Sequence, residues 1–288
     1  MGFLGFIRFN FIKVAAALVV LSCLCTKVVY AHEEPSNSQV RFALSRPSTA
    51  VETPRFTLYF PSTKEDSGIP LDKLAKSTLE VLDDTYEELS QQFKVRPKQK
   101  VVFRFLTPEE FKRYTGAPAW TSAMYLRGEV SIPVSKEKRP NPVELRRAIR
   151  HEYTHAVVAE LSGKRCPAWL DEGLAQMMEG DVNPLLGPAL RKWNDGNKEV
   201  MPLEWLQNGF MGLNEQIVPA AYAQSLFSTR LIVERLGYTA VLKYLDQLRK
   251  GEEESDAFRV AFGLTSRDFE RKLALHIAIW AKGSEINP

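Results

Sequence analysis

Two histidines and a glutamate stand close together near the middle of the chain and could carry out hydrolytic chemistry. His151 and His155 are four residues apart, and Glu152 follows the first of them. Residues four apart lie on one face of a helix, so both imidazoles can hold one zinc ion while the glutamate acts as a base. The alternative is two surface histidines and a partly buried glutamate, because this short pattern also arises by chance. The pattern indicates a metal-dependent hydrolase. The residues around it must decide between this interpretation and a chance occurrence.

The flanking residues predict the helix that this pattern needs. Asn141 can accept a hydrogen bond at the N-cap, Pro142 suits the first helical position, and Gly163 suits the end. We therefore expect a helix from about 142 to 161. At about 100° per residue, Glu152 falls on the apolar stripe of this helix. A carboxylate on a buried stripe needs a metal, a water or a donor, which favours a chemical role.

A catalytic zinc ion normally takes three protein ligands and keeps its fourth position for water, so a third ligand is needed. Pro167 can open a second helix, on which Leu170 and Leu174 predict an apolar face. Glu172 lies on another face, among alanines that would permit a close approach to the histidine helix. An ordinary solvated carboxylate is the alternative interpretation of Glu172.

Together the two segments resemble a known family. The His-Glu-x-x-His pattern followed by Trp-Leu-Asp-Glu-Gly-Leu-Ala at 169–175 is similar to the gluzincin metallopeptidases, in particular the peptidase-MA-like domains of bacteria. The resemblance extends from about Arg55 to Trp280, although only these two motifs are sharp. It implies an α+β fold of the thermolysin-like zincin type. A small mixed N-terminal lobe and a mainly helical C-terminal lobe would then enclose a zinc site between them.

The resemblance also implies roles for single residues. His151, His155 and Glu172 would be the ligands of one Zn²⁺ ion per chain, and Glu152 would be the general base. Tyr222 is the expected donor to the oxyanion, because related gluzincins often use a tyrosine from a downstream helix.

Two of these assignments have alternatives. Tyr222 shares a helical stripe with Leu226 and Val233, so a core tyrosine is an equally good interpretation. His276 is the other possible oxyanion donor, although a packing histidine is the simpler interpretation of its helix. Gln176, one turn after the third ligand, could support that ligand through a hydrogen bond.

One segment is a plausible substrate-binding element. Residues 125–133 read as a short strand, and in the resembling superfamily an edge strand just before the motif helix pairs with an extended peptide. Pro133 and the charged run 136–139 suit an edge that must not pair promiscuously. A solvated hairpin is the alternative.

Residues 1–31 have the layout of a secretory signal. Arg8 and Lys13 lead into an apolar run at 14–25, and 29–31 offers a cleavage site. The apolar run is short for a membrane span. We expect an exported protein, periplasmic or extracellular in a bacterium. The alternative is a membrane anchor formed by an uncleaved 1–31.

Charge and cysteine content limit the kinds of molecule that the protein is expected to bind and the role of its cysteine. The chain has 38 basic and 35 acidic residues, and loss of Arg8, Lys13 and Lys27 with the signal makes the remainder neutral. This leaves no argument for nucleic-acid binding, so a peptide or protein substrate is expected. Cys166 would then be the single cysteine, and it is most simply interpreted as a small apolar residue.

We expect four segments along the chain: a signal peptide at 1–31, a flexible segment at 32–54, a mixed α/β lobe at 55–163, and a helical lobe at 164–288 that supplies the third zinc ligand. Periodicity and capping predict strands at 55–60 and 100–106 and helices at 71–93, 219–236, 239–249 and 266–281. A further helix is expected to start at Thr107.

The leading hypothesis is therefore an exported zinc metallopeptidase. The second is a non-catalytic, zinc-stabilised binding or scaffold protein of the cell envelope, and the third is an amidase acting on cell-envelope peptides. A scaffold does not require Glu152, so the presence of this residue favours the enzyme. The sequence does not separate endo- from exopeptidase action.

Overall fold

A computed structural model describes residues 49–61, 70–117, 121–135, 141–180, 183–197, 199–210 and 212–283. Its sheet has five strands in the order β1-β2-β3-β5-β4. The three inner strands run parallel, and the two edge strands run antiparallel to their neighbours. The strands are β1 (Thr49–Glu52), β2 (Phe56–Phe60), β3 (Val101–Leu106), β4 (Met124–Leu126) and β5 (Glu129–Pro133).

The helices account for most of the remaining described chain. They are α2 (Leu71–Phe93), α3 (Pro108–Thr115), α4 (Pro142–Ser162), α5 (Ala168–Met178), α6 (Leu186–Asn197), the 3₁₀ helix η1 (Leu203–Leu206), α7 (Val218–Arg249), α8 (Glu254–Phe262) and α9 (Ser266–Lys282). The fold combines α and β structure as the sequence predicts. No helix in the described ranges is both long and apolar enough to cross a membrane.

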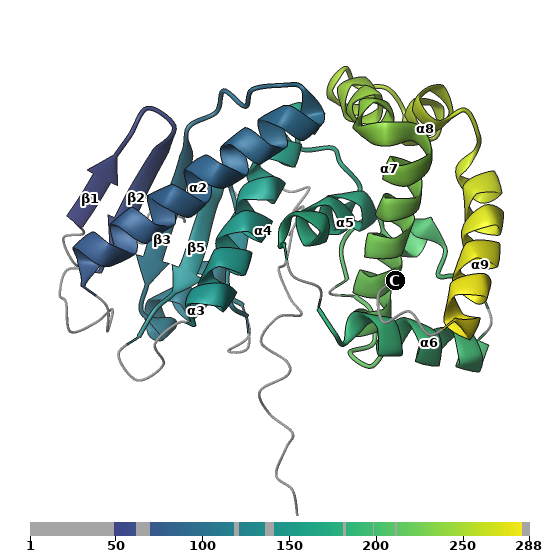
Figure 1. Ribbon diagram of the computed structural model, residues 1–288, viewed down its shortest axis with the longest axis horizontal. Helices are drawn as coiled ribbons and strands as arrows, with labels where there is room; N and C mark the ends of the chain where they lie inside the picture. Colours follow the sequence, from purple (N-terminus) through teal and green to yellow (C-terminus); the bar gives the residue numbers. More distant parts are fainter. Residues whose placement is uncertain are drawn as a thin grey trace, which may run out of the picture.

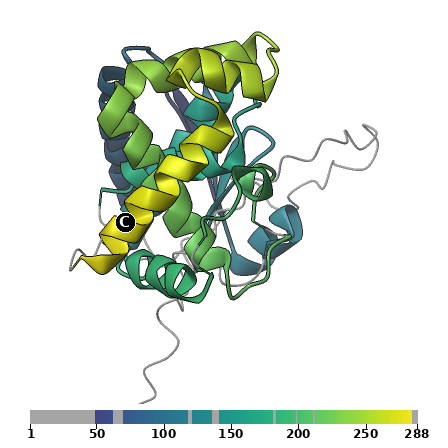
Figure 2. The same ribbon diagram turned by 90° about the vertical axis from the view of Figure 1, so that its right-hand side faces the viewer.

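The sheet and the later helices occupy opposite ends of the molecule. Figure 1 shows α2 and α4 lying across one face of the sheet, with α7, α8 and α9 at the other end and α5 between them. In the view turned by 90°, α9 crosses in front as the outermost helix (Figure 2). Helix α4 packs against α2 and β4 as well as α5 and α7, so it joins the two ends.

The core explains why α4 lies on the sheet. The ring of Tyr153 on α4 meets Phe56 of β2 edge-on at 5.3 Å between centroids and contacts Phe103 of β3. All three side chains are buried. Aromatic pairs in this geometry are stabilising beyond the area they bury, which holds α4 on the strands.

Local signals at the helix ends act as expected. The Asn141 side chain accepts a hydrogen bond from the backbone N–H of Val143, and Gly163 ends α4 in the left-handed conformation. Thr107 and Glu110 form a reciprocal capping box at the start of α3. Gly237 (φ 72°, ψ 169°) interrupts α7, which agrees with the predicted separation of two helices there.

Residues 125–133 are not the single strand predicted; they form a hairpin, as in the alternative interpretation, but its strands are largely buried rather than solvated. The segment forms the hairpin of β4 and β5, turning at Arg127 (φ 55°) and Gly128 (φ 87°). Two successive left-handed residues make the tight turn whose twist matches paired strands. Strand β5, with Pro133, lies between β3 and β4, so β4 is the edge strand of the sheet.

The N-terminal predictions fall mostly outside the described residues. The signal at 1–31 and residues 32–48 of the predicted flexible segment are not among them. The end of that segment differs from the prediction, because 49–52 form β1 paired with β2. The charged run 136–139 also lies outside the described residues.

Candidate metal centre

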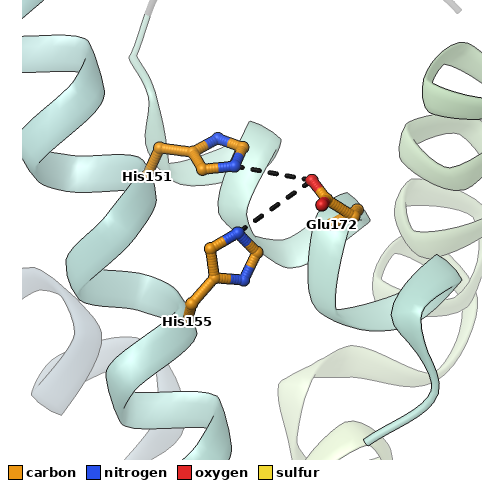
Figure 3. Close-up of side chains that lie close together, drawn as sticks. All are labelled: His151, His155 and Glu172. Carbon is orange, nitrogen blue, oxygen red and sulfur yellow. Dashed lines mark ion pairs between the residues drawn. The ribbon is translucent and has the colours of Figure 1, made fainter. Parts of the chain in front are cut away.

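Helices α4 and α5 bring three side chains to one point. His151 and His155 project from successive turns of α4, and the carboxylate of Glu172 reaches between them from α5 (Figure 3). Glu172 Oε2 lies 3.5 Å from His151 Nε2 and 4.0 Å from His155 Nε2. One potential ligand atom from each residue lies within 4.8 Å of the other two. These three residues can therefore hold a metal ion together.

The spacing and burial of the donors fit such an ion. Donors about 2.0–2.1 Å from a tetrahedral zinc ion lie roughly 3.4 Å from one another, close to the two distances above. All three residues are buried, which excludes the solvated-carboxylate interpretation of Glu172. His155 Nε2 has no hydrogen-bond partner among the described residues. A buried nitrogen left in this state is costly, and a metal ion would satisfy it.

The opposite nitrogen of each imidazole faces a further carboxylate. His151 Nδ1 lies 2.8 Å from Glu179 Oε1, and His155 Nδ1 lies 2.9 Å from Asp171 Oδ1. A carboxylate on this side favours the tautomer with hydrogen on Nδ1. Each Nε2 is then the nitrogen that can bind a metal.

Arginines of α4 support this arrangement. Arg147 Nη2 lies 2.5 Å from Glu179 Oε2, so the carboxylate that contacts His151 is also paired with a cation. Arg150 is buried, donates to the carbonyl of Met178 and pairs with Glu88. The long side chains of both arginines tie α4 to the end of α5.

The carboxylates make the site favourable for positive charge. Burial opposes a charged imidazole at His151, but Glu172 and Glu179 outweigh it and hold its pKa well above the ordinary value. Burial likewise opposes charge on His155, and Asp171 and Glu172 raise its pKa. Nearby anions favour the protonated form of a base because they stabilise its charge. The same field favours a bound cation.

Glu152 lies fully buried beside this cluster. Its Oε2 accepts a 2.6 Å hydrogen bond from the backbone N–H of Tyr125 on β4, while its Oε1 has no partner among the described residues. Burial raises the pKa of Glu152 to about 7, against the opposing effect of His151 and His155. One oxygen is thus fixed by the edge strand, and the other is available for a proton.

Close packing of α5 against α7 determines where Glu172 stands. A Cβ on Gly173 would meet Thr229 Oγ1 at 2.0 Å and the carbonyl oxygen of Ser225 at 2.5 Å. Only glycine permits this approach. All residues from Ala168 to Ala175 are buried, so α5 is covered on every side rather than on one apolar face.

The backbone of Tyr222 is linked to the backbone of Glu172 by the side chain of Gln176. Gln176 Nε2 donates to the carbonyl oxygens of both Glu172 and Tyr222 and bridges α5 to α7. We expected Gln176 to support the ligand Glu172. It does so through the backbone oxygen of Glu172 and not through the Glu172 carboxylate. The Tyr222 ring is buried and packs edge-on against Phe210. Its role as oxyanion donor stays a prediction.

His276 lies on α9, which packs against α6, α7 and α8. In Figure 1 this helix is at the end of the molecule away from α4, with α7 between them. This placement favours Tyr222 over His276. Cys166 is buried as a free cysteine, and burial raises the pKa of its thiol, which agrees with an inert small residue.

The sequence did not reveal three groups that contact the residues of the centre: the carboxylates of Asp171 and Glu179 and the backbone amide of Tyr125. The first two carry a faint signal, because Asp171 precedes Glu172 and Glu179 follows it by two helical turns, on the same face. The amide carries none, because any residue there would supply it.

The region that holds the cluster matches a known family. The family model of the Peptidase MA superfamily matches residues 136–278, a span that includes α4, α5 and α7. No curated protein matches the chain. The match contains the three potential metal ligands and agrees with the motif resemblance. Through residues 136–278, the chain belongs to the peptidase MA superfamily.

Proposed function

We propose that the protein is an exported zinc metallopeptidase that hydrolyses peptide bonds with Glu152 as the general base. One observation carries the proposal. Two imidazoles and one carboxylate converge beside a fully buried glutamate that has one unpartnered oxygen. A binding site for a structural metal alone gives no reason to bury that additional carboxylate. Membership of the peptidase MA superfamily supports the same reaction class.

Zinc is the metal that we propose. Two imidazole nitrogens and one carboxylate oxygen form the ligand set of many catalytic zinc sites, which keep a fourth position open. A zinc ion bound there would supply Lewis acidity that lowers the pKa of a water molecule and polarises a carbonyl. Glu179 and Asp171 would hold the imidazoles in the orientation needed for binding.

The residues of the chain then divide the work of hydrolysis. The backbone N–H of Tyr125 holds Glu152 Oε2 in place. Glu152 Oε1 takes a proton from the water molecule while the water oxygen attacks the peptide carbon. The protonated Glu152 passes this proton to the leaving nitrogen as the C–N bond breaks. We propose that Tyr222 donates to the oxyanion that forms in between.

We further propose that the substrate lies along β4, the edge strand. An extended peptide can add to an exposed sheet edge through backbone hydrogen bonds. The bond from Tyr125 to Glu152 supports this location, because it places the edge beside the base. The zincin arrangement of two lobes around the site, and export directed by residues 1–31, complete the proposal.

The test compares metal content with hydrolysis in matched variants. Mature protein should bind about one zinc ion per chain and cleave members of a diverse peptide library. Glu152→Gln should keep the metal and lose at least about 10²–10⁴-fold in hydrolysis, because only the base is removed. Glu172→Ala should weaken zinc binding. Glu144→Gln, an exposed residue of the same helix as Glu152, is the control that should change neither.

The outcomes separate the hypotheses. Full zinc binding by Glu172→Ala would remove Glu172 from the ligand set. Zinc binding without any hydrolysis that depends on Glu152 would support the scaffold hypothesis. Cleavage confined to cell-envelope peptides would support the amidase reading instead.

A further inference from the structure

Helix α9 carries apolar side chains on two opposite sides. Its inner side packs on α6, α7 and α8 through the buried residues Phe269, Leu273, Ile277 and Trp280. Leu275 and Ile279 are 61% and 60% exposed, the highest values among the large apolar side chains of the described residues. At about 100° per residue they lie on the side opposite the buried set, so they take no part in the core.

The side chains that surround this exposed pair are mostly basic. The outer face of α9 consists of the residues that share the side of Leu275: Asp268, Arg271, Lys272, Leu275, Ile279 and Lys282. Three basic residues against one acidic residue leave a formal charge of +2 on this face. The single carboxylate, that of Asp268, is already paired with Arg271 and accepts a hydrogen bond from the Thr265 hydroxyl. The outer face is therefore apolar at its centre and positively charged around it.

The order of these residues along the helix matters as well. Lys272 stands three residues before Leu275, and Lys282 stands three residues after Ile279, so the two ammonium groups flank the apolar pair at both ends. A lysine can lay its methylene groups on an apolar surface while its ammonium group stays in a polar layer. A helix with this pattern can lie in a membrane interface, where apolar side chains enter the acyl boundary and cations meet the headgroups.

The position of α9 makes its outer face accessible. Figure 2 shows α9 crossing in front of the other helices as the outermost one. In Figure 1 it stands at the end of the molecule away from α4, with α7 between them. A surface that contacts α9 from outside would therefore leave the metal centre clear. No helix in the described ranges can cross a membrane, so a contact through α9 would be peripheral.

The charges argue against a second copy of the chain as the partner. If two outer faces met through Leu275 and Ile279, the flanking lysines of one copy would stand against those of the other, whichever way the helices ran. Like charges at such short range are destabilising. A stable interface also needs about 800 Å² per partner, far more than two side chains supply. An anionic bilayer meets both requirements, because it is negatively charged and yields to a convex helix.

We propose that the outer face of α9 docks on the surface of an anionic lipid membrane. Leu275 and Ile279 enter the boundary between headgroups and acyl chains, and Lys272 and Lys282 pair with the anionic headgroups. This inference is independent of the proposed peptidase function, since α9 contributes no residue to the metal centre.

Co-sedimentation of the mature protein with lipid vesicles tests the docking. Residues 1–31 are left out because their apolar run would itself bind lipid. The protein should bind vesicles of equal parts phosphatidylcholine and phosphatidylglycerol about 10- to 30-fold more tightly than vesicles of phosphatidylcholine alone, as expected for two net charges. Added salt should reduce this preference because it screens the charges. Equal binding to both vesicles, or binding to neither, would overturn the proposal.

Two pairs of variants separate the apolar and the ionic contributions. Leu275→Gln with Ile279→Gln should weaken binding to the anionic vesicles at least about 10-fold, because the apolar area that enters the lipid is lost. Leu236→Gln is its control, since this exposed leucine of α7 stands two residues from Tyr238, which packs on Phe93 of α2. Lys272→Gln with Lys282→Gln should remove most of the preference for phosphatidylglycerol. Lys73→Gln with Lys76→Gln, two exposed lysines of α2, is the control of equal charge.

A fluorescent label identifies the face that touches the lipid. Leu275→Cys can be labelled with an environment-sensitive dye, because Cys166, the other cysteine of the mature protein, is buried. The emission should shift to the blue when anionic vesicles are added, whereas the same dye on Lys73→Cys should not shift. A shift at residue 73 alone would place the lipid contact elsewhere and overturn the proposal.

Sedimentation without lipid tests the competing partner. The mature protein should remain a monomer as its concentration rises. A dimer that is lost in the variant with Leu275→Gln and Ile279→Gln would assign the outer face to self-association and overturn membrane docking.

Discussion

At the scale of single residues, the metal centre depends on carboxylates that never reach the metal position. Asp171 and Glu179 face the Nδ1 atoms of the two histidines, while both Nε2 atoms face Glu172. The contact fixes ring orientation and makes each imidazole a better donor. Mutation of these carboxylates should therefore weaken metal binding without removing a ligand.

Asp171→Asn tests this directly. The change keeps the shape of the side chain but removes the charge that faces His155. Zinc affinity should fall about 10- to 100-fold, measured by competition with a chromogenic chelator. Asp195→Asn, an exposed position on α6, is the control. Unchanged affinity in the Asp171 variant would mean that this contact has no part in binding the metal.

A second residue-scale prediction concerns Glu129 in the sheet. Arg104 contacts both of its oxygens, at 2.5 and 2.9 Å, and Tyr114 donates to it at 2.9 Å. Burial opposes ionisation of Glu129, but these hydrogen bonds outweigh it and lower its pKa. A lowered pKa stabilises the fold above the unfolded-state value of about 4.3, and this contribution is lost as the pH falls.

Glu129→Gln should therefore lower the free energy of unfolding by about 1–2 kcal/mol at pH 7. The difference from the wild type should shrink below about pH 4, where the wild-type carboxyl also becomes neutral. Urea unfolding at both pH values measures this. Glu109→Gln, on the exposed side of α3, should show little effect at either. A deficit that does not depend on pH would show that packing, not charge, is responsible.

At the scale of elements, the position of Glu172 depends on how closely α5 approaches α7. The following residue, Gly173, faces Thr229 and the carbonyl of Ser225 with no room for a methyl group. One neighbour in that contact is backbone, which cannot turn aside. Any larger residue must push the two helices apart, and Glu172 moves with α5.

Gly173→Ala should lower the free energy of unfolding by about 1–3 kcal/mol and weaken zinc binding as well. Gly196→Ala on α6 is the matched control, because a Cβ there meets nothing within 4 Å. That change should be neutral or slightly stabilising, since alanine favours helix. Thermal unfolding and zinc titration of both variants give the comparison. A Gly173 variant with normal stability and zinc binding would contradict the packing argument.

At the scale of the whole molecule, a metal ion would link its two ends. The histidine helix α4 packs on the sheet through Tyr153, whereas Glu172 belongs to α5, which packs on α7. An ion shared by α4 and α5 binds only when both are in place. Binding to the folded state alone stabilises a protein by mass action.

Zinc should therefore raise the melting temperature of the mature protein. At free zinc of 1,000 times the dissociation constant, the gain is about 4 kcal/mol. A chelator should reverse it, as followed by thermal unfolding. Glu172→Ala should show a much smaller response at equal zinc. An equal response in that variant would place the stabilising ion elsewhere on the protein.

The local features of this protein were predictable from its sequence because neighbours along the chain determine them. Four-residue spacing puts His151 and His155 on one helical face wherever that helix packs. Asn141 and Gly163 bound the helix through contacts with adjacent backbone. Glu172 was predictable with the help of a familiar second motif, which the match to the Peptidase MA superfamily supports.

The remaining features were decided by tertiary structure, because they join segments far apart in the chain. Residues 125 and 152 meet only when the hairpin of β4 and β5 lies beside α4, and the sequence left a strand and a solvated hairpin open there. From the sequence alone, Glu179 could equally contact His151 or face solvent. The packing of α5 against α4 places it on His151. The sequence determined which groups could do chemistry, and packing at a distance determined which of them meet.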